Sequence, residues 1–259
     1  MNDISDSEKR KEHIRNIFSK QWSRTREQYG TSKYDKDLIH ELSKKVKNGK
    51  ILEVGIGDGF PYSNVLDEMG YEVYGIDISP THVDMVKESL PNINVRVGDS
   101  EDLEFTDNFF DVVFCFRSTW YFPDVIMSIS EMLRVVKNDG LIMFDIQNSN
   151  NLIHKYGIKK EKQKNRNNHI YNIVKLLKNI IKIIIKPIKS YYYDWLFRRS
   201  PIIFQTPTDP NNVNRYLKSR DDVYYRIYGV RWDHSSTLEE TKKIMDLDQF
   251  DRLVYKVFK

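Results

Sequence analysis

Short apolar runs and amphipathic segments of helical period alternate along the middle of the chain. The apolar runs predict strands near residues 50–54, 71–76, 93–98, 110–116 and 140–146. The segments between them predict helices near residues 61–69, 80–90 and 123–136. Because parallel strands need helical crossovers, this order predicts an α/β fold, with a doubly wound parallel sheet covered by helices on both faces.

Further helices and strands are predicted on both sides of this region. Apolar residues at helical spacing predict an amphipathic helix within 7–28 and a second helix over about 35–47. After Asn148 the alternation stops until Thr208-Asp209-Pro210, which begins a helix, and two alternating runs at 223–231 and 252–258 predict the last strands. The chain is therefore expected to consist of an N-terminal helical lid (1–48), a core (49–148), a helical cap insertion (149–207) and the C-terminal part of the core (208–259).

The insertion differs from the rest of the chain in charge. The whole chain carries +4, but residues 151–200 carry +11 and the remainder −7. Apolar residues from Ile170 to Ile185 share one helical face, and lysines from Lys175 to Lys189 share the opposite face. This pattern favours a helix that covers the active site as a cap. A peripheral helix on an anionic membrane surface is the alternative.

The composition limits the class of protein. Hydrophobic residues make up 40% of the chain and charged residues 30%, as in a globular protein. The single cysteine, Cys115, excludes an intramolecular disulfide, and without a Cys/His cluster no structural zinc or other metal site is expected. The charged N-terminal residues do not form a secretory signal, and no run reaches the roughly 18 apolar residues of a spanning helix. We therefore expect a cytoplasmic protein.

Three glycines follow the first predicted strand in the sequence Glu53-Val-Gly55-Ile-Gly57-Asp-Gly59. Glycines at this point let the backbone turn sharply and approach a ligand where a Cβ atom would collide. A dinucleotide site would instead have the spacing G-x-G-x-x-G, with a helix N-terminus facing a pyrophosphate. The acid two residues before the first glycine would repel a pyrophosphate but suits a ligand with a positive amino group.

The next two strands each end in a carboxylate. Asp77 lies twenty-two residues after Gly55, where the ribose hydroxyls of a nucleoside would lie in a doubly wound sheet. Asp99, followed by Ser100, ends the third strand and can accept a hydrogen bond from an adenine amino group. Together with the glycines, these carboxylates predict a nucleoside ligand.

Four ordered segments, ILEVGIGDG, YGIDIS, VRVGDSEDLEF and FFDVVFCFRSTWYF, resemble the class I S-adenosylmethionine-dependent methyltransferases. The resemblance covers about residues 30–148 and includes the segment ISEMLRVVKNDG that leads into the fifth strand. It implies a Rossmann-like sheet of seven strands with the last strand antiparallel. The cofactor would be S-adenosyl-L-methionine, lying across the carboxyl ends of strands one to four.

The resemblance also implies roles for individual residues. The methionine part of the cofactor would lie near Glu53, through water, and near Gly55 and Gly57. Its nucleoside part would contact Asp77 at the ribose and Asp99 and Ile78 at the adenine. The remaining residues expected to bind the cofactor are Gly59, Ser100 and Phe116. Arg117 and Tyr121 follow the fourth strand, where members of the family line the methyl-transfer site.

The chemistry of the acceptor decides whether a general base is needed. An alkyl hydroxyl must lose a proton, whereas a carboxylate is already a nucleophile. His154, just beyond the fifth strand, and His234, after the sixth, are the candidate bases. Arg117 and Arg231 are candidate cations for positioning a carboxylate.

The acceptor is expected to be a small molecule. No N-P-P-Y-type run and no catalytic cysteine pair are present, so DNA is not an expected partner. The segments FDIQNSN and PTDP, with the insertion between them, more loosely resemble bacterial methyltransferases that modify sugars for surface or capsular polysaccharides. This implies O-methylation of a sugar or nucleotide sugar, on a hydroxyl or a uronic acid carboxylate. The alternatives are a lipid-linked acceptor at a membrane surface and a non-catalytic partner subunit.

Overall fold

The computed structural model describes residues 6–21, 30–45, 47–151, 206–231, 238–240, 247 and 249–259. Its helices are α1 (Asp6–Gln21), α2 (Lys33–Ser43), α3 (Ser63–Glu68), α4 (Pro80–Ser89), α5 (Val125–Val135) and α8 (Pro210–Lys218). Its strands are β1 (Lys50–Val54), β2 (Glu72–Asp77), β3 (Asn94–Val97), β4 (Phe110–Cys115), β5 (Val136–Gln147), β6 (Tyr224–Val230), β7 (Glu239–Glu240) and β8 (Arg252–Phe258). A short 3₁₀ helix, Thr119–Tyr121, follows β4.

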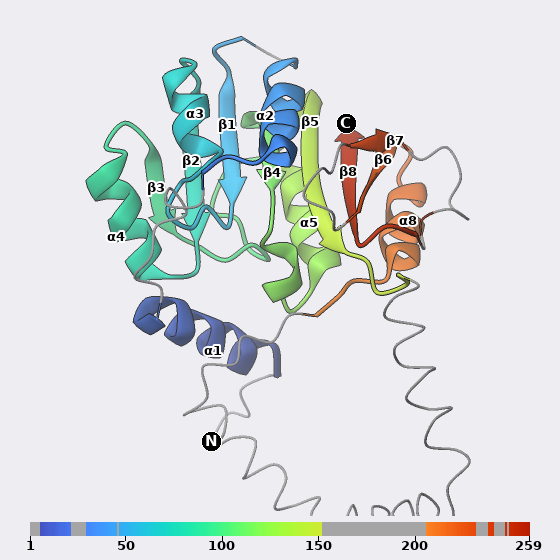
Figure 1. Cartoon of the computed structure of the whole chain (residues 1–259), viewed down its shortest axis with the longest axis horizontal. Coiled ribbons are helices and arrows are strands. Elements are labelled where there is room, and N and C mark those ends of the chain that lie inside the picture. The colour runs from blue at the N-terminus through green and yellow to red at the C-terminus, as the bar shows by residue number, and fades with distance from the viewer. Residues whose placement is uncertain are drawn as a thin grey trace, which may run out of the picture.

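The strands form one mixed sheet in the order β3-β2-β1-β4-β5-β8-β6-β7 (Figure 1). The strands from β3 to β5 pair in parallel. The last strand, β8, lies between β5 and β6 and runs antiparallel to both. The predicted seven-stranded sheet with an antiparallel last strand is thus confirmed, and the two-residue β7 extends its edge.

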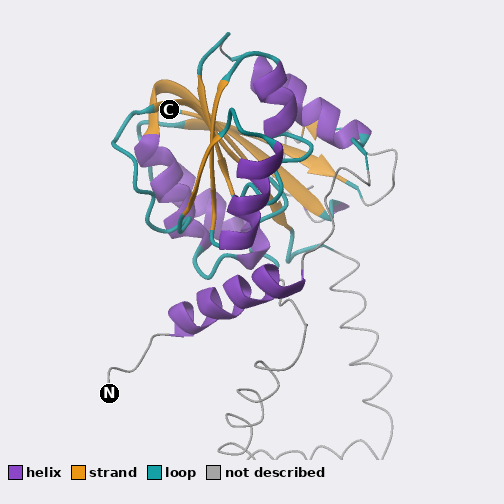
Figure 2. Ribbon diagram, turned by 90° about the vertical axis from the view of Figure 1, so that its left-hand side faces the viewer, coloured by secondary structure: helices purple, strands orange, loops and turns teal. Residues whose placement is uncertain are grey.

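Helices cover both faces of this sheet (Figure 2). On one face, Ile129 and Met132 of α5 and Val213 of α8 pack in a core that includes Leu52 of β1. On the other face, α2, α3 and α4 pack in a second core that includes Ile51. Neighbouring residues of β1 therefore enter opposite cores, which explains why the parallel strands read as continuous apolar runs.

Most element boundaries agree with the sequence patterns because local capping sets them. Ser79 caps α4 by accepting from the His82 N–H, and Pro80 occupies the first turn. The start of β5 differs from the prediction, which placed this strand near 140–146. The strand begins at Val136, which pairs with Phe110, and the register shifts before Val112 pairs with Leu141.

Helix α1 lies beyond the carboxyl ends of the parallel strands, apart from the two helical layers (Figure 1). This end of a doubly wound sheet is where ligands bind. Among the described helices, none combines the length and the apolar character needed to cross a bilayer. The cap insertion predicted over 149–207 lies, apart from its first three and last two residues, outside the described residues, so the four-part division of the chain stays a prediction.

Candidate active site

A cavity of about 380 Å³ opens at the carboxyl ends of β1 to β4. This volume is in the range of small-molecule sites. Its walls are the glycine loop (55–58), the ends of β2 (76–78) and β3 (98–100), the segment after β4 (117, 118 and 120–123), His82, and Lys11, Ile14 and Phe18 of α1. The ends of four strands, which were predicted to bind one ligand, therefore line the same cavity. Helix α1, for which no ligand contact was predicted, lines it as well.

Glycine is needed for different structural reasons at the three positions after β1. Gly55, Gly57 and Gly59 have φ values of +77°, +59° and +84°, which favour glycine. A Cβ at Gly55 would lie 2.7 Å from Ser118 Oγ, and one at Gly59 would lie 2.5 Å from Leu90 Cδ1. A Cβ at Gly57 would meet nothing within 4 Å. Gly55 and Gly59 thus allow close packing within the protein, whereas Gly57 leaves open space beside the cavity.

Asp77 is fixed by the backbone around it. One carboxylate oxygen, Oδ2, accepts from Gly57 N at 2.9 Å, and the other, Oδ1, accepts from Ser79 N at 2.9 Å. Oδ1 also lies 3.3 Å from His82 Nδ1. The residue is 8% exposed and lines the cavity. The same carboxylate therefore orders the glycine loop and presents a charged acceptor to a ligand.

Asp99 lies at the end of β3, between its own loop and α1. Its Oδ1 accepts from Glu101 N at 2.9 Å, and its Oδ2 lies 2.7 Å from the ammonium of Lys11. Burial alone would lower the pKa of Lys11, but hydrogen bonds from the ammonium to Asp99 and Glu101 raise this pKa above its usual value. The neighbouring Ser100 shares a hydrogen bond of 2.9 Å with Ser128 Oγ. Lys11 was not predicted as a site residue.

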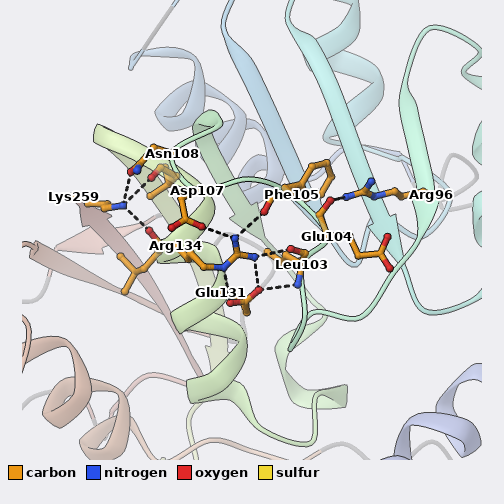
Figure 3. Close-up of polar contacts among 11 residues, drawn as sticks. Arg96, Leu103, Glu104, Phe105, Asp107, Asn108, Glu131, Arg134 and Lys259 are labelled. Atoms are coloured by element: carbon orange, nitrogen blue, oxygen red, sulfur yellow. Dashed lines mark hydrogen bonds and ion pairs between the residues drawn. The ribbon is translucent and has the colours of Figure 1, made fainter.

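Arg134 of α5 holds the loop that connects Asp99 to β4 (Figure 3). Its guanidinium donates to the carbonyls of Leu103 and Phe105 at 2.6 and 2.8 Å. It also pairs with Asp107 at 2.8 Å and with Glu131 at 2.7 Å. Glu131 in turn accepts from Leu103 N at 2.8 Å. Arg134 and Glu131 together therefore hold the loop that begins at the predicted adenine site.

We expect Arg134→Met to lower the free energy of unfolding by about 2 kcal/mol, because two loop carbonyls and two carboxylates lose a charged donor. Urea unfolding measures this change. Arg220→Met is the matched control, since Arg220 pairs with the exposed Asp222 two residues away and its loss should change stability by well under 1 kcal/mol. Equal effects of the two substitutions would show that Arg134 does not hold the loop.

Three of the predicted cofactor residues lie behind the cavity wall. Glu53 is 3% exposed and accepts from Ser63 Oγ at 2.6 Å. Phe116 is buried against Tyr62, with ring centroids 5.1 Å apart, and Gly59 packs on Leu90. None of the three lines the cavity, whereas Gly55, Gly57, Asp77, Ile78, Asp99, Ser100, Arg117 and Tyr121 all do.

Arg117 has an unusual backbone conformation at the edge of the cavity. Its φ is +59°, which is rare for a residue other than glycine. Its N–H donates to Asp145 Oδ1 at 2.7 Å, and its guanidinium donates to Asp35 Oδ1 at 2.7 Å. Asp35 also accepts from Tyr62 OH at 2.6 Å. Both ends of Arg117 are therefore held by buried carboxylates.

Asp145 connects this edge of the cavity to a buried ionic network. It is fully buried, accepts from Tyr34 OH at 3.0 Å and lies 3.4 Å from Arg252 Nη1. Burial, followed by the charge of Asp145, raises the pKa of Tyr34 well above its usual value, so the phenol stays a donor. The Arg252 guanidinium also lies 4.9 Å from the ring centroid of Trp120. The only signal of this network in the sequence is an acid within the apolar run of β5.

The candidate bases are not placed by the structure. His154 and His234 lie outside the described residues, so their role in catalysis stays a prediction. Of the histidines that are described, His82 lines the cavity, where its ring lies 5.4 Å from that of Phe18.

Comparison with known proteins supports the assignment of the domain. Residues 52–144 match the family model described as a methyltransferase domain. The 2-methyl-6-phytyl-1,4-hydroquinone methyltransferase of Synechocystis is 34% identical over 96 residues, which are 36% of this chain and 30% of that protein. Demethylmenaquinone methyltransferase of Staphylococcus aureus is 28% identical over 152 residues, 54% of this chain and 62% of that protein. The chain thus aligns with less than two thirds of the length of either relative.

A solved structure shares the fold over most of the chain. An S-adenosylmethionine-dependent methyltransferase of Thermotoga maritima superposes with a TM-score of 0.53, covering 86% of this chain and 88% of that one at 12% identity. At this identity the likeness concerns the fold alone. Residues 52–144 therefore match a methyltransferase domain, and the chain shares the fold of an S-adenosylmethionine-dependent methyltransferase of solved structure.

Proposed function

We propose that this protein transfers a methyl group from S-adenosylmethionine to a small-molecule acceptor. The observation that carries this proposal is the convergence of Gly57, Asp77 and Asp99 on one cavity within a methyltransferase domain. An open glycine loop and carboxylates at the ends of β2 and β3 suit a nucleoside that carries a positive amino group. Both features line the cavity, which supports the proposal.

Each of these residues has a binding role in the proposal. Asp77 accepts hydrogen bonds from the ribose hydroxyls, Asp99 accepts one from the adenine amino group, and Ile78 packs against the adenine. The methionine part lies along Gly55 and Gly57, where the absence of a side chain at Gly57 leaves room. The cofactor supplies a methyl group on a sulfonium, and the protein's task is to align it with the acceptor and exclude water.

The acceptor lies, in this proposal, at the end of the cavity formed by the segment after β4. Arg117 is oriented there by Asp35 and Asp145. Tyr121 packs edge-on against Phe18 of α1, with ring centroids 5.2 Å apart. A cation and aromatic rings in the wall of one cavity suit an acceptor that carries both an anionic or polar oxygen and an apolar body.

Two acceptor classes follow from different observations. The loose sequence resemblance supports a sugar or nucleotide sugar, methylated on a hydroxyl or a uronic acid carboxylate. The relatives support the second class, because their names identify methyltransferases of a hydroquinone and a demethylmenaquinone. The apolar residues Ile14, Phe18 and Phe122 in the cavity wall also suit a quinol ring.

The test is transfer of a labelled methyl group to a panel of nucleotide sugars, uronic acids, soluble hydroquinones and lipid vesicles with and without a quinol. We expect binding of S-adenosylmethionine and transfer to one class. Transfer only to vesicle-borne acceptors would support the peripheral membrane alternative. Failure of the wild-type protein to bind S-adenosylmethionine would contradict the proposed function as a whole.

The chemistry of the acceptor predicts which substitutions impair turnover. If the acceptor is a hydroxyl, His154→Ala or His234→Ala should lower turnover by roughly 10²–10⁴-fold with little change in cofactor affinity, since general-base assistance has this size. If it is a carboxylate, both variants should stay active and Arg117→Ala should raise the KM of the acceptor. Mild alkali distinguishes the products, because it cleaves a methyl ester and not a methyl ether. An alkali-stable product made without either histidine would contradict the assigned bases.

A further inference from the structure

Helix α1 forms the outer wall of the cavity. Ile14 and Phe18 face the cavity from this helix. Arg15 Nε donates to the carbonyl of Ile78 at 3.3 Å, and the carbonyl of Ser19 accepts from Thr81 Oγ1 at 3.2 Å. These hydrogen bonds connect α1 to the end of β2 and the start of α4. The contact between α1 and the end of β3 is an ion pair.

At the end of β3, the contact is an ion pair centred on Lys11, whose side chain is nearly closed to solvent. Lys11 Nζ lies 2.7 Å from Asp99 Oδ2, 2.8 Å from Glu101 Oε2 and 3.3 Å from Glu8 Oε1. The side chain of Lys11 is 8% exposed and that of Glu101 7%, whereas that of Asp99 is 30% exposed. Asp99 therefore pairs with α1 on one side and keeps a face on the cavity.

The chemistry of a carboxylate allows both contacts at once. Its two oxygens together accept about four hydrogen bonds. In the described part of the chain, the Asp99 carboxylate accepts one hydrogen bond from Glu101 N and one from the Lys11 ammonium. A ligand amino group can thus bind Asp99 without displacing the ammonium. Lys11 also balances part of the negative charge that Asp77, Asp99 and Glu101 place at this end of the cavity.

We propose that Lys11 is a positioning residue for the cofactor, which orients Asp99 toward the adenine amino group and holds α1 closed over the adenine. This inference rests on the proposed function, because it takes Asp99 as the adenine ligand. The ion pair slows release of the nucleoside, since the cofactor leaves only when α1 separates from Asp99 and Glu101.

The test measures association and dissociation rates of S-adenosylhomocysteine by stopped-flow or surface plasmon resonance. Lys11→Met should weaken affinity by at least about tenfold, mostly through faster dissociation, because α1 then loses its ion pairs with Asp99 and Glu101 and separates from them more readily. Lys11→Arg should recover most of the affinity. Lys9→Met, the same change at an exposed lysine of the same helix, is the matched control and should bind as the wild type does.

Two further measurements separate positioning from a general effect on folding. Lys11→Met in an Asp99→Asn background should weaken binding much less than in the wild type, because the two residues act together. The loss should also be smaller for S-inosylhomocysteine, which lacks the purine amino group. A thermal unfolding midpoint for each variant shows that the protein is folded.

The outcomes distinguish this inference from the proposed function. Unchanged affinity in Lys11→Met would overturn the inference while leaving the proposed function intact. Tighter binding would also overturn it, because Lys11 would then compete with the adenine for Asp99. Absence of binding in the wild-type protein would instead overturn the proposed function.

Discussion

Replacing Asp145 by alanine should lower the free energy of unfolding by about 3–5 kcal/mol, the usual cost of removing one partner from a buried ion pair. Asp145 is fully buried and is the acceptor for Tyr34 OH and Arg117 N. It also lies 3.4 Å from Arg252, whose side chain is 14% exposed. The substitution therefore leaves a buried guanidinium without its carboxylate and two donors without their acceptor. Urea unfolding followed by circular dichroism measures the change.

A double-mutant cycle shows whether the unpaired charge of Arg252 causes this loss of stability. Arg252→Met alone should also be strongly destabilising, because it leaves the Asp145 carboxylate buried beside Tyr34. The double variant Asp145→Ala/Arg252→Met should be more stable than the sum of the two single effects predicts, since neither charge is then left alone. Strictly additive losses, or a loss below about 1 kcal/mol in Asp145→Ala, would contradict the assignment of an energetically coupled pair.

Replacing Asp77 should have the largest effect on cofactor binding. Two hydrogen bonds from the ribose to a charged acceptor contribute roughly 1.5–3 kcal/mol each. Asp77→Ala also removes the acceptor of Gly57 N and Ser79 N, so it disturbs the glycine loop as well. Asp77→Asn retains an oxygen for one of these donors and separates the loss of charge from the loss of loop order. Calorimetric titration with S-adenosylmethionine and S-adenosylhomocysteine measures both variants.

The control for these titrations is Asp84→Ala, which removes an exposed carboxylate from α4, close to Asp77 in the sequence. We expect its affinity to equal that of the wild type, and we expect no competition from NAD. An Asp77→Ala variant that is folded and binds with undiminished affinity would remove Asp77 from the proposed site.

The type and order of the elements could be predicted because they depend on residues close together in the chain. The pattern of β4, predicted over 110–116, is observed over Phe110–Cys115, and Ser79-Pro80 begins α4 as expected. The start of β5 was predicted near residue 140, after its observed start at Val136, because Asn138-Asp139-Gly140 has the composition of a turn. Its pairing begins at Val136 because that residue meets Phe110 of β4, a contact that no local pattern contains.

The convergence of Gly57, Asp77 and Asp99 could also be predicted, because the carboxyl ends of parallel strands meet at one edge of the sheet. The exact partner of each side chain could not be predicted from the sequence. Gly59 was expected to bind the cofactor, and in the structure the absence of a Cβ there leaves room for Leu90, the residue that ends α4. Phe116 was also expected to bind the cofactor, and in the structure its ring packs against that of Tyr62.

The sequence alone was sufficient to assign the fold, the methyltransferase resemblance and the strand ends that line the cavity, since all of these follow from local periodicity and short motifs. Only the tertiary structure identified Lys11 beside Asp99 and the network that joins Asp35, Arg117 and Asp145. In that network, Asp35 and Arg117 lie 82 positions apart in the sequence, and Tyr34 and Asp145 lie 111 positions apart. A charged residue has the same local signature whether it faces solvent or a buried partner, so its role is decided only when packing brings the distant residue to it.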